Sequence, residues 1–77
     1  MVIRMYWGDH PPPHFHVECG SDQAVIRFDT LELTKGALPR RVHALVVEWA
    51  MLHRAELREN WQRAERGEAL EPIAPLE

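Results

Sequence analysis

The segment Asp9-His10-Pro11-Pro12-Pro13-His14-Phe15-His16-Val17-Glu18 joins a stiff loop to a strand. Its three consecutive prolines lack backbone donors and have a fixed φ angle, so residues 9–13 form neither a helix nor a central strand. From His14 onward polar and apolar residues alternate, which is the side-chain period of a β-strand. One face of this strand carries His14, His16 and Glu18, and the other carries Phe15, Val17 and Cys19. We therefore expect a proline loop that presents a His-x-His-x-Glu face, with an apolar face behind it.

Two further strands flank this one. Residues 2–7 alternate in the same way, and residues 23–28 follow the turn-forming residues Gly20-Ser21-Asp22. The short turn predicts an antiparallel hairpin of strands 14–19 and 23–28. Residues 29–33 either prolong the third strand or begin a turn, and Lys35-Gly36 ends that segment.

A long helix is predicted over residues 39–66. Pro39 suits a first helical turn, and Gly67 is a natural stop signal. The apolar residues between them recur mostly at spacings of three and four, the helical period: Val42, Leu45, Val46, Trp49, Leu52, Leu57 and Trp61. The tail, residues 67–77, contains prolines and large aliphatic residues, so we expect it to pack in an extended form on the domain or on a partner.

These elements predict one α+β domain over residues 1–77. A small antiparallel sheet of three strands packs on one long C-terminal helix, in the order β-β-β-α, and an extended tail follows. The helix covers the apolar face of the sheet. A chain of 77 residues has a small core, so short connections or a partner are expected to help its stability.

Composition narrows the class of protein. The formal net charge of −3 argues against a protein that binds a nucleic-acid backbone through its overall charge. A local basic patch is still compatible with this composition. The single cysteine, Cys19, forms no internal disulfide and lies on the apolar face of its strand, so a buried structural thiol in a reducing cytoplasm is expected. No apolar run reaches the ~20 residues that span a bilayer, and no signal-peptide pattern is present.

The second face of the predicted sheet has no element to cover it, and its residues can bind a metal. Strand alternation places six chemically useful side chains there: Arg4, Tyr6, His14, His16, Glu18 and Arg27. Histidines at i and i+2 can share one metal ion, with Glu18 or His10 as a third ligand, and this donor set suits zinc. The alternative is that both histidines are partly exposed and hydrogen-bond the proline loop.

The same face also suits acid–base chemistry. Histidine moves protons near neutral pH and arginine stabilises developing phosphoryl charge, as in a metal-independent phosphodiester-cleaving enzyme. The candidate catalytic residues are His14, His16, Tyr6, Arg4 and Glu18. The alternative is a solvated face that binds another protein, for which the candidate binding residues are Asp9, His10, Arg27 and Trp61. Trp49 is expected in the core, whereas Trp61 either joins the core or anchors a partner.

The chain resembles a small bacterial family catalogued as domain of unknown function 4160. The resemblance rests on the first strand, the Pro-Pro-His-Phe-His segment, the Gly36-Ala37-Leu38-Pro39 helix start, Glu56-Leu57 with Asn60-Trp61, and the closing Ile73-Ala74-Pro75-Leu76-Glu77. Members usually carry more residues before the first strand and two prolines in the loop, where this chain has three. The resemblance names no catalytic residues.

The resemblance implies a compact bacterial cytoplasmic protein. Genes of this family often lie beside a gene for a protein of the domain of unknown function 2442 family. Such a pair is interpreted as a toxin–antitoxin module, with the present family as the candidate toxin. We therefore expect a toxin-like component that binds its partner and a cellular target, with no required cofactor. The alternatives are a small nuclease or a zinc-binding domain that uses the His-x-His strand. A homodimer through the open sheet face or the edge of the first strand also fits so small a core.

Overall fold

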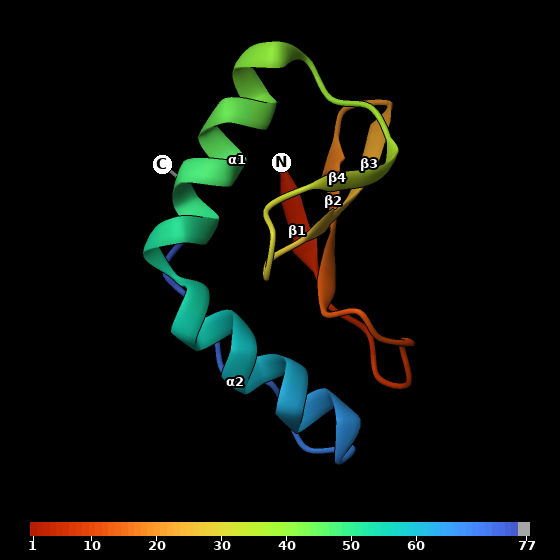
Figure 1. Cartoon of the computed structure of the whole chain (residues 1–77), viewed down its shortest axis with the longest axis vertical. Coiled ribbons are helices and arrows are strands. Elements are labelled where there is room, and N and C mark those ends of the chain that lie inside the picture. Colours follow the sequence, from red (N-terminus) through yellow and green to blue (C-terminus); the bar gives the residue numbers. More distant parts are fainter. Residues whose placement is uncertain (76–77) are drawn as a thin grey trace.

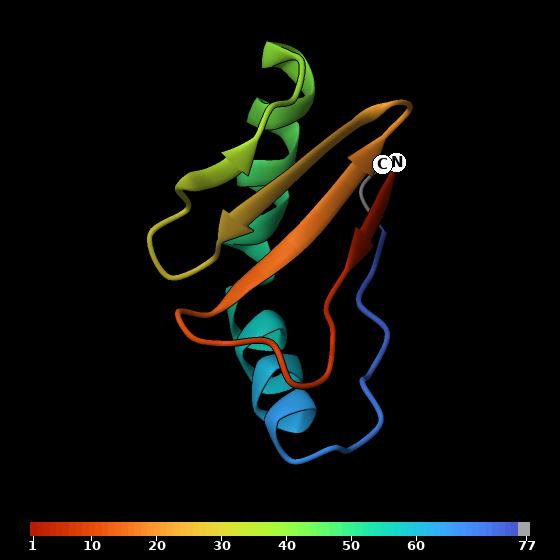
Figure 2. The same cartoon turned by 90° about the vertical axis from the view of Figure 1, so that its right-hand side faces the viewer.

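A four-stranded antiparallel sheet in the order β1-β2-β3-β4 lies on one side of the molecule, and two helices lie on the other (Figures 1 and 2). The structure is a computed structural model that describes residues 1–75. The elements, in chain order, are β1 (Val2–Arg4), β2 (His14–Cys19), β3 (Asp22–Arg27), β4 (Leu33–Gly36), α1 (Arg40–Leu52) and α2 (Arg54–Glu65). The α+β class and the order of sheet before helix are confirmed.

The register of the sheet separates apolar from polar residues. In the β2–β3 hairpin Phe15 lies opposite Ile26 and Val17 opposite Ala24, and all four side chains are buried. On the other face His14 lies opposite Arg27. The predicted alternation of β2 therefore holds from His14 to Glu18, because a slip of one residue would have turned its phenylalanine toward solvent. Cys19, which was expected to be buried, is only half-buried because it lies at the end of the strand beside the turn.

The segment after β3 begins a turn rather than prolonging the strand. The backbone N–H of Arg27 donates to the carbonyl of Glu32 over 2.9 Å, and Leu31 adopts a positive φ of 66°. The chain then returns as β4, a fourth strand that the sequence did not predict. The first strand is also shorter than expected, since it ends at Arg4 rather than Trp7.

Gly36 ends β4 at a very close approach to β3. Its φ is +76°, and a Cβ atom built there would lie 2.0 Å from the backbone oxygen of Gln23. Neighbouring backbone cannot move away as a flexible side chain would, so this position requires glycine for two separate reasons. Gly20 in the β2–β3 turn also has a positive φ, of +60°, but its missing Cβ would meet nothing within 4 Å.

Gly36→Ala is therefore expected to destabilise the fold much more than Gly20→Ala. The Gly20 variant carries only the left-handed backbone penalty of about 1–2 kcal/mol, whereas the Gly36 variant adds a backbone clash that must displace β4. Urea unfolding of both variants beside the parent chain measures the difference. Equal losses for the two variants would show that β3 and β4 are not held this closely.

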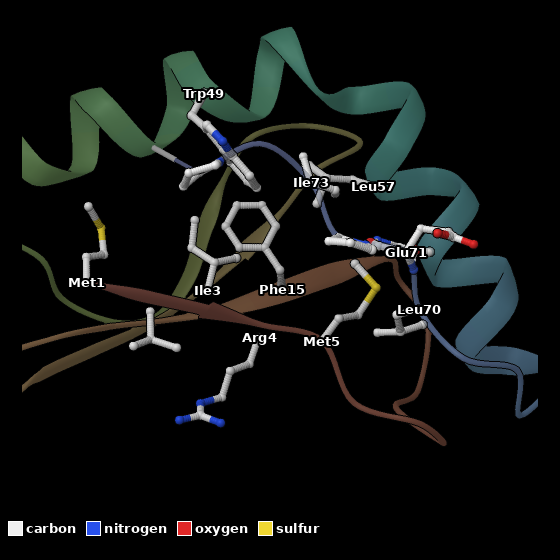
Figure 3. Close-up of a pocket in the computed structure, with 14 residues that line it drawn as sticks. Met1, Ile3, Arg4, Met5, Phe15, Trp49, Leu57, Leu70, Glu71 and Ile73 are labelled. Carbon is white, nitrogen blue, oxygen red and sulfur yellow. Dashed lines mark hydrogen bonds between the residues drawn. The ribbon is translucent and has the colours of Figure 1, made fainter. Parts of the chain in front are cut away.

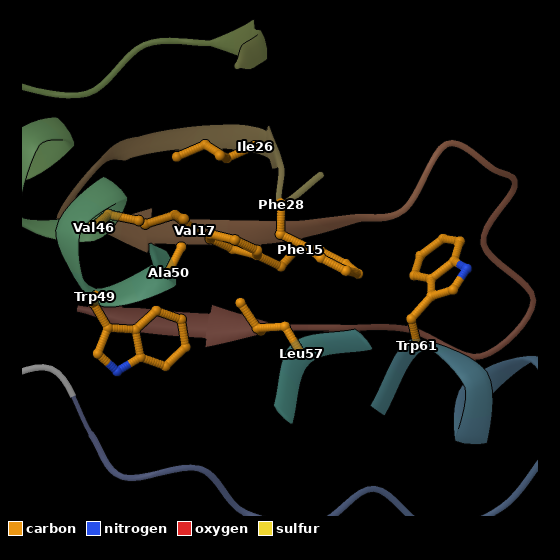
Figure 4. Close-up of a cluster of buried hydrophobic side chains, with 9 residues drawn as sticks. All are labelled: Phe15, Val17, Ile26, Phe28, Val46, Trp49, Ala50, Leu57 and Trp61. Carbon is orange, nitrogen blue, oxygen red and sulfur yellow. The ribbon is translucent and has the colours of Figure 1, made fainter. Parts of the chain in front are cut away.

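The helical region is divided at His53, where the sequence predicted one helix. No proline or glycine lies between residues 40 and 66, so the periodicity contains no break signal. The bend brings α1 and α2 around the same core, to which Val46, Trp49, Leu57 and Trp61 all belong (Figure 4). A straight helix from Val46 to Trp61 would extend about 22 Å, longer than the ~20 Å of a six-residue strand. Neither helix is long and apolar enough to cross a membrane.

Only one of the three leucines on the predicted helix face is buried. Leu57 is buried as predicted, but Leu45 and Leu52 are 45% and 77% exposed. The Nε atom of Arg54 donates to the backbone carbonyl of Phe28 over 3.1 Å, so the junction between the helices is fixed to the end of β3. The helical period therefore identified the covering element but not which of its leucines face the core.

The tail packs on the domain, as expected, through polar contacts with the helices. The buried side chain of Asn60 donates to the carbonyl of Glu71 and accepts from its N–H, both over 2.8 Å. The indole N–H of Trp49 donates to the carbonyl of Ala74 over 2.9 Å. All of these hydrogen bonds are made to backbone atoms of the tail, and they hold the tail in an extended form beside β1 (Figure 2). Leu76 and Glu77 lie outside the described residues.

We expect Asn60→Ala to release the tail and to lower the free energy of unfolding by about 1–3 kcal/mol, the usual effect of leaving buried polar partners unpaired. Urea unfolding measures the loss, and limited proteolysis should cut the variant between residues 67 and 75. Gln62→Ala is the control, because Gln62 is exposed on the same helix. A tail that stays protected in the Asn60 variant would contradict this role.

Candidate functional site

The polar face of the sheet is turned away from α1, and it reaches α2 only at one end, where His14 contacts Trp61. Figure 2 views the sheet with the helices behind it, and within residues 1–75 no helix lies in front of this face. The strand register brings Arg4 opposite His16 and His14 opposite Arg27. The six side chains that the sequence placed on this face are all exposed or half-buried: Arg4, Tyr6, His14, His16, Glu18 and Arg27.

A cluster of three residues, Asp9, His14 and His16, forms where the proline loop folds back onto β2. The Nε2 atom of His16 lies 3.2 Å from Oδ2 of Asp9, and the Nε2 atom of His14 lies 3.3 Å from the same oxygen. One ligand atom from each of the three residues lies within 4.8 Å of the others. The cluster is half-buried, with 26%, 15% and 30% of the respective side chains exposed.

The proline loop orients one of these imidazoles. The Nδ1 atom of His14 lies 2.8 Å from the carbonyl oxygen of Pro12. A carbonyl oxygen can only accept, so Nδ1 of His14 carries the proton and donates it. In the neutral ring the lone pair then lies on Nε2, the nitrogen that faces Asp9. The sequence alternative that the histidines hydrogen-bond the loop therefore holds for both, since His14 bonds Pro12 and His16 bonds Asp9, and it coexists with the cluster.

Aromatic rings enclose the cluster on two sides. Tyr6 contacts His16 edge-on with 4.8 Å between ring centroids, and His14 lies 5.2 Å from the ring of Trp61. Trp61 is only 6% exposed and also contacts Phe28. The structure therefore places Trp61 in the core, where it packs against His14, and leaves it too little exposed surface to anchor a partner.

The carboxylate that reaches the histidines is not the one that strand spacing favoured. Glu18 is on the expected face, but its Oε1 pairs with the Nε of Arg4 at 3.3 Å. His10 is exposed in the loop and is not part of the cluster. Asp9, expected only as a binding residue, takes the third position. Its contact depends on the path of the proline loop in space, for which the sequence contains no periodic signal.

A hollow of about 280 Å³ opens beside the cluster on the same face. Its lining includes Tyr6, His16, Glu18 and Lys35. A larger groove of about 520 Å³ lies elsewhere, between β1, the helices and the tail. Figure 3 shows that this groove is walled mainly by apolar side chains, including Ile3, Phe15 and Trp49, while Arg4 points away from them. Since Asn60 in its lining is already bonded to the tail, the polar face is the better candidate site.

The end of the polar face is held by an ion pair between Arg27 and Asp29. Oδ2 of Asp29 lies 2.6 Å from a guanidinium nitrogen, and Oδ1 lies 2.9 Å from Nε. Hydrogen bonds from Arg27 lower the pKa of Asp29, and the carboxylate in turn raises the pKa of Arg27. Arg27, the last residue of β3, is thus fixed to Asp29 in the turn that follows, and its charge is partly neutralised.

This ion pair predicts a pH-dependent contribution to stability. A carboxyl group whose pKa is lower in the folded chain stabilises the fold above its unfolded pKa of about 3.9, and that contribution is lost as the pH falls through the folded pKa. We expect Asp29→Asn to lower the urea midpoint slightly at pH 7 and to have no effect once the pH lies below the folded pKa of Asp29. Screening should also reduce the difference in 1 M salt. A difference that is the same at both pH values would contradict the assignment.

Comparison with known proteins gives a family match. Residues 1–62 match the family model described as Domain of unknown function (DUF4160). The matched range contains the whole polar face, the cluster, and the two residues that hold the tail, Trp49 and Asn60, while the tail itself lies beyond it. No curated protein and no solved structure matched the chain.

Proposed function

The chain belongs to the Domain of unknown function (DUF4160) family, and we propose that it is a toxin-like component of a bacterial two-gene toxin–antitoxin module that binds its partner protein through the polar sheet face. The observation that carries this proposal is the uncovered face itself. A sheet with one buried and one open face offers a broad surface that a second chain can cover.

The side chains on and beside this face are those that interfaces favour. Tyr6 is 47% exposed and Trp7, in the adjoining turn, is 63% exposed. Arg4 lies on the same face as Tyr6. Tyrosine, tryptophan and arginine dominate the binding energy of protein–protein interfaces. A partner that covers them would remove large aromatic surface from water.

The partner that the family resemblance suggests is a protein of the domain of unknown function 2442 family encoded beside this chain, in the cytoplasm. One feature of the chain is consistent with a reducing compartment. Its single cysteine, Cys19, is free and half-buried, so no disulfide supports the fold. A homodimer through the same face would compete with the partner, since both would cover Tyr6.

The decisive prediction concerns Tyr6 and Trp7. We expect the full chain to arrest bacterial growth alone and to be neutralised by the neighbouring gene product. The Tyr6→Ala/Trp7→Ala variant should bind that protein at least about 30-fold more weakly, since loss of an interface hot spot costs about 2 kcal/mol or more. Calorimetric titration of the two purified proteins measures the affinity.

Leu52→Ala is the matched control. Leu52 is apolar, is more exposed than Tyr6 or Trp7, at 77%, and lies on α1 away from the sheet face. Equal weakening by both variants, or no complex at all, would overturn the proposal. The His14→Ala/His16→Ala variant in the same growth assay tests the second candidate, a small nuclease. That candidate is favoured by the convergence of His14 and His16 with Tyr6, and it requires loss of arrest in a chain that still binds the partner.

A further inference from the structure

We propose that Asp9, His14 and His16 bind one zinc ion through three ligand atoms and leave a fourth coordination position open toward the polar face. The proposal concerns the cluster alone, and it stands whether or not the chain is a toxin. It also names a different third ligand from the one that strand spacing favoured.

The separations of the ligand atoms fit a tetrahedral ion. Zinc lies about 2.0–2.1 Å from nitrogen and oxygen ligands, so two ligands of a tetrahedral site lie about 3.3 Å apart. Both histidine Nε2 atoms already lie at this spacing from one oxygen of Asp9, at 3.2 and 3.3 Å. All three ligand atoms lie within 4.8 Å, so small side-chain rotations close the remaining edge.

The charges in the cluster also call for a cation. With the Nδ1 proton of His14 donated to the carbonyl of Pro12, the neutral ring directs its Nε2 lone pair toward the carboxylate of Asp9. Two acceptors facing each other at this distance repel, and a cation between them reverses the sign of the interaction. Histidines that bind metals commonly donate their other ring N–H to a backbone carbonyl, which fixes the tautomer in this way.

The surroundings favour a site with an accessible position. His14 and His16 project from a strand whose opposite side chains are buried, and Asp9 belongs to a loop stiffened by prolines, so little ordering is needed on binding. The hollow lined by Tyr6 and His16 gives access from solvent. Three protein ligands with one open position are typical of catalytic rather than structural zinc sites, in which the fourth ligand is a water molecule.

Calorimetric titration of the metal-stripped, tag-free full chain with zinc chloride at pH 7.5 tests this assignment. We expect one ion per chain. Asp9→Asn, His14→Gln and His16→Gln should each weaken binding by more than about 100-fold, since even the outer partners of metal ligands are worth 10–100-fold. His10→Gln and Glu18→Gln are the matched controls and should retain the affinity, because His10 is a loop neighbour and Glu18 is occupied by Arg4.

Each alternative outcome overturns the proposal. Equal binding by all variants, or binding lost only with His10→Gln, would indicate an adventitious ion only. Loss with Glu18→Gln but not with Asp9→Asn would show that the ligand set is the one first expected from strand spacing. No saturable heat would leave the cluster without metal, with Asp9 hydrogen-bonded to His16 and His14 to the carbonyl of Pro12.

A second measurement uses the unmodified chain and so does not depend on the folding of variants. Zinc should protect His14 and His16 from acylation by diethyl pyrocarbonate, read by mass spectrometry of the peptides, while His10 stays reactive. Equal reactivity of His14 and His16 with and without zinc would contradict metal binding at these atoms. Cobalt(II) in place of zinc should give the strong visible absorption of a tetrahedral site, and a weak octahedral spectrum would contradict the proposed geometry.

Discussion

Burial of one face of the β2–β3 hairpin is the constraint on which the rest of the structure depends. Phe15, Val17 and Ile26 are fully buried beneath the two helices (Figure 4), and burying a side chain of this kind is worth about 1.5–3 kcal/mol. Because side chains alternate along a strand, the same register fixes His14 and His16 on the opposite face. The position of the polar face is therefore a consequence of the core.

The elements that could be predicted from the sequence are those with a strict period or a strong local signal. The β2–β3 hairpin has both an alternating pattern and a Gly-Ser-Asp turn, and its polar side chains lie on the predicted face. The helical period found the covering element and the core positions of Val46, Trp49 and Leu57. Local patterns were sufficient here because the physical causes act between near neighbours in the chain.

The features that could not be predicted depend on contacts between distant residues. Asp9 meets His16 only because the proline loop returns to β2, and Glu18 is occupied by Arg4, which lies 14 residues earlier in the chain. The bend at His53 has no proline or glycine to announce it, and β4 is a short strand, mostly exposed, that is held by the close approach of Gly36 to β3. In each case the feature depends on a tertiary contact that no periodic pattern in the sequence indicates.

The two edges of the sheet are poorly suited to pairing with another strand, which is why the partner is proposed on the polar face. The tail runs beside the β1 edge, held by Asn60 and Trp49 through backbone contacts, so strand pairing there would have to displace it. The opposite edge, β4, has four residues and carries Lys35 near its end, and short charged edges discourage pairing. A dimer through the β1 edge, one of the two arrangements that the sequence allowed, is thereby disfavoured.

A partner that instead covers the polar face would also cover the Asp9–His14–His16 cluster and shield its open position from water. Under the two proposals, partner binding and metal access at the cluster exclude each other, which gives a direct physical route by which the proposed partner silences this chain.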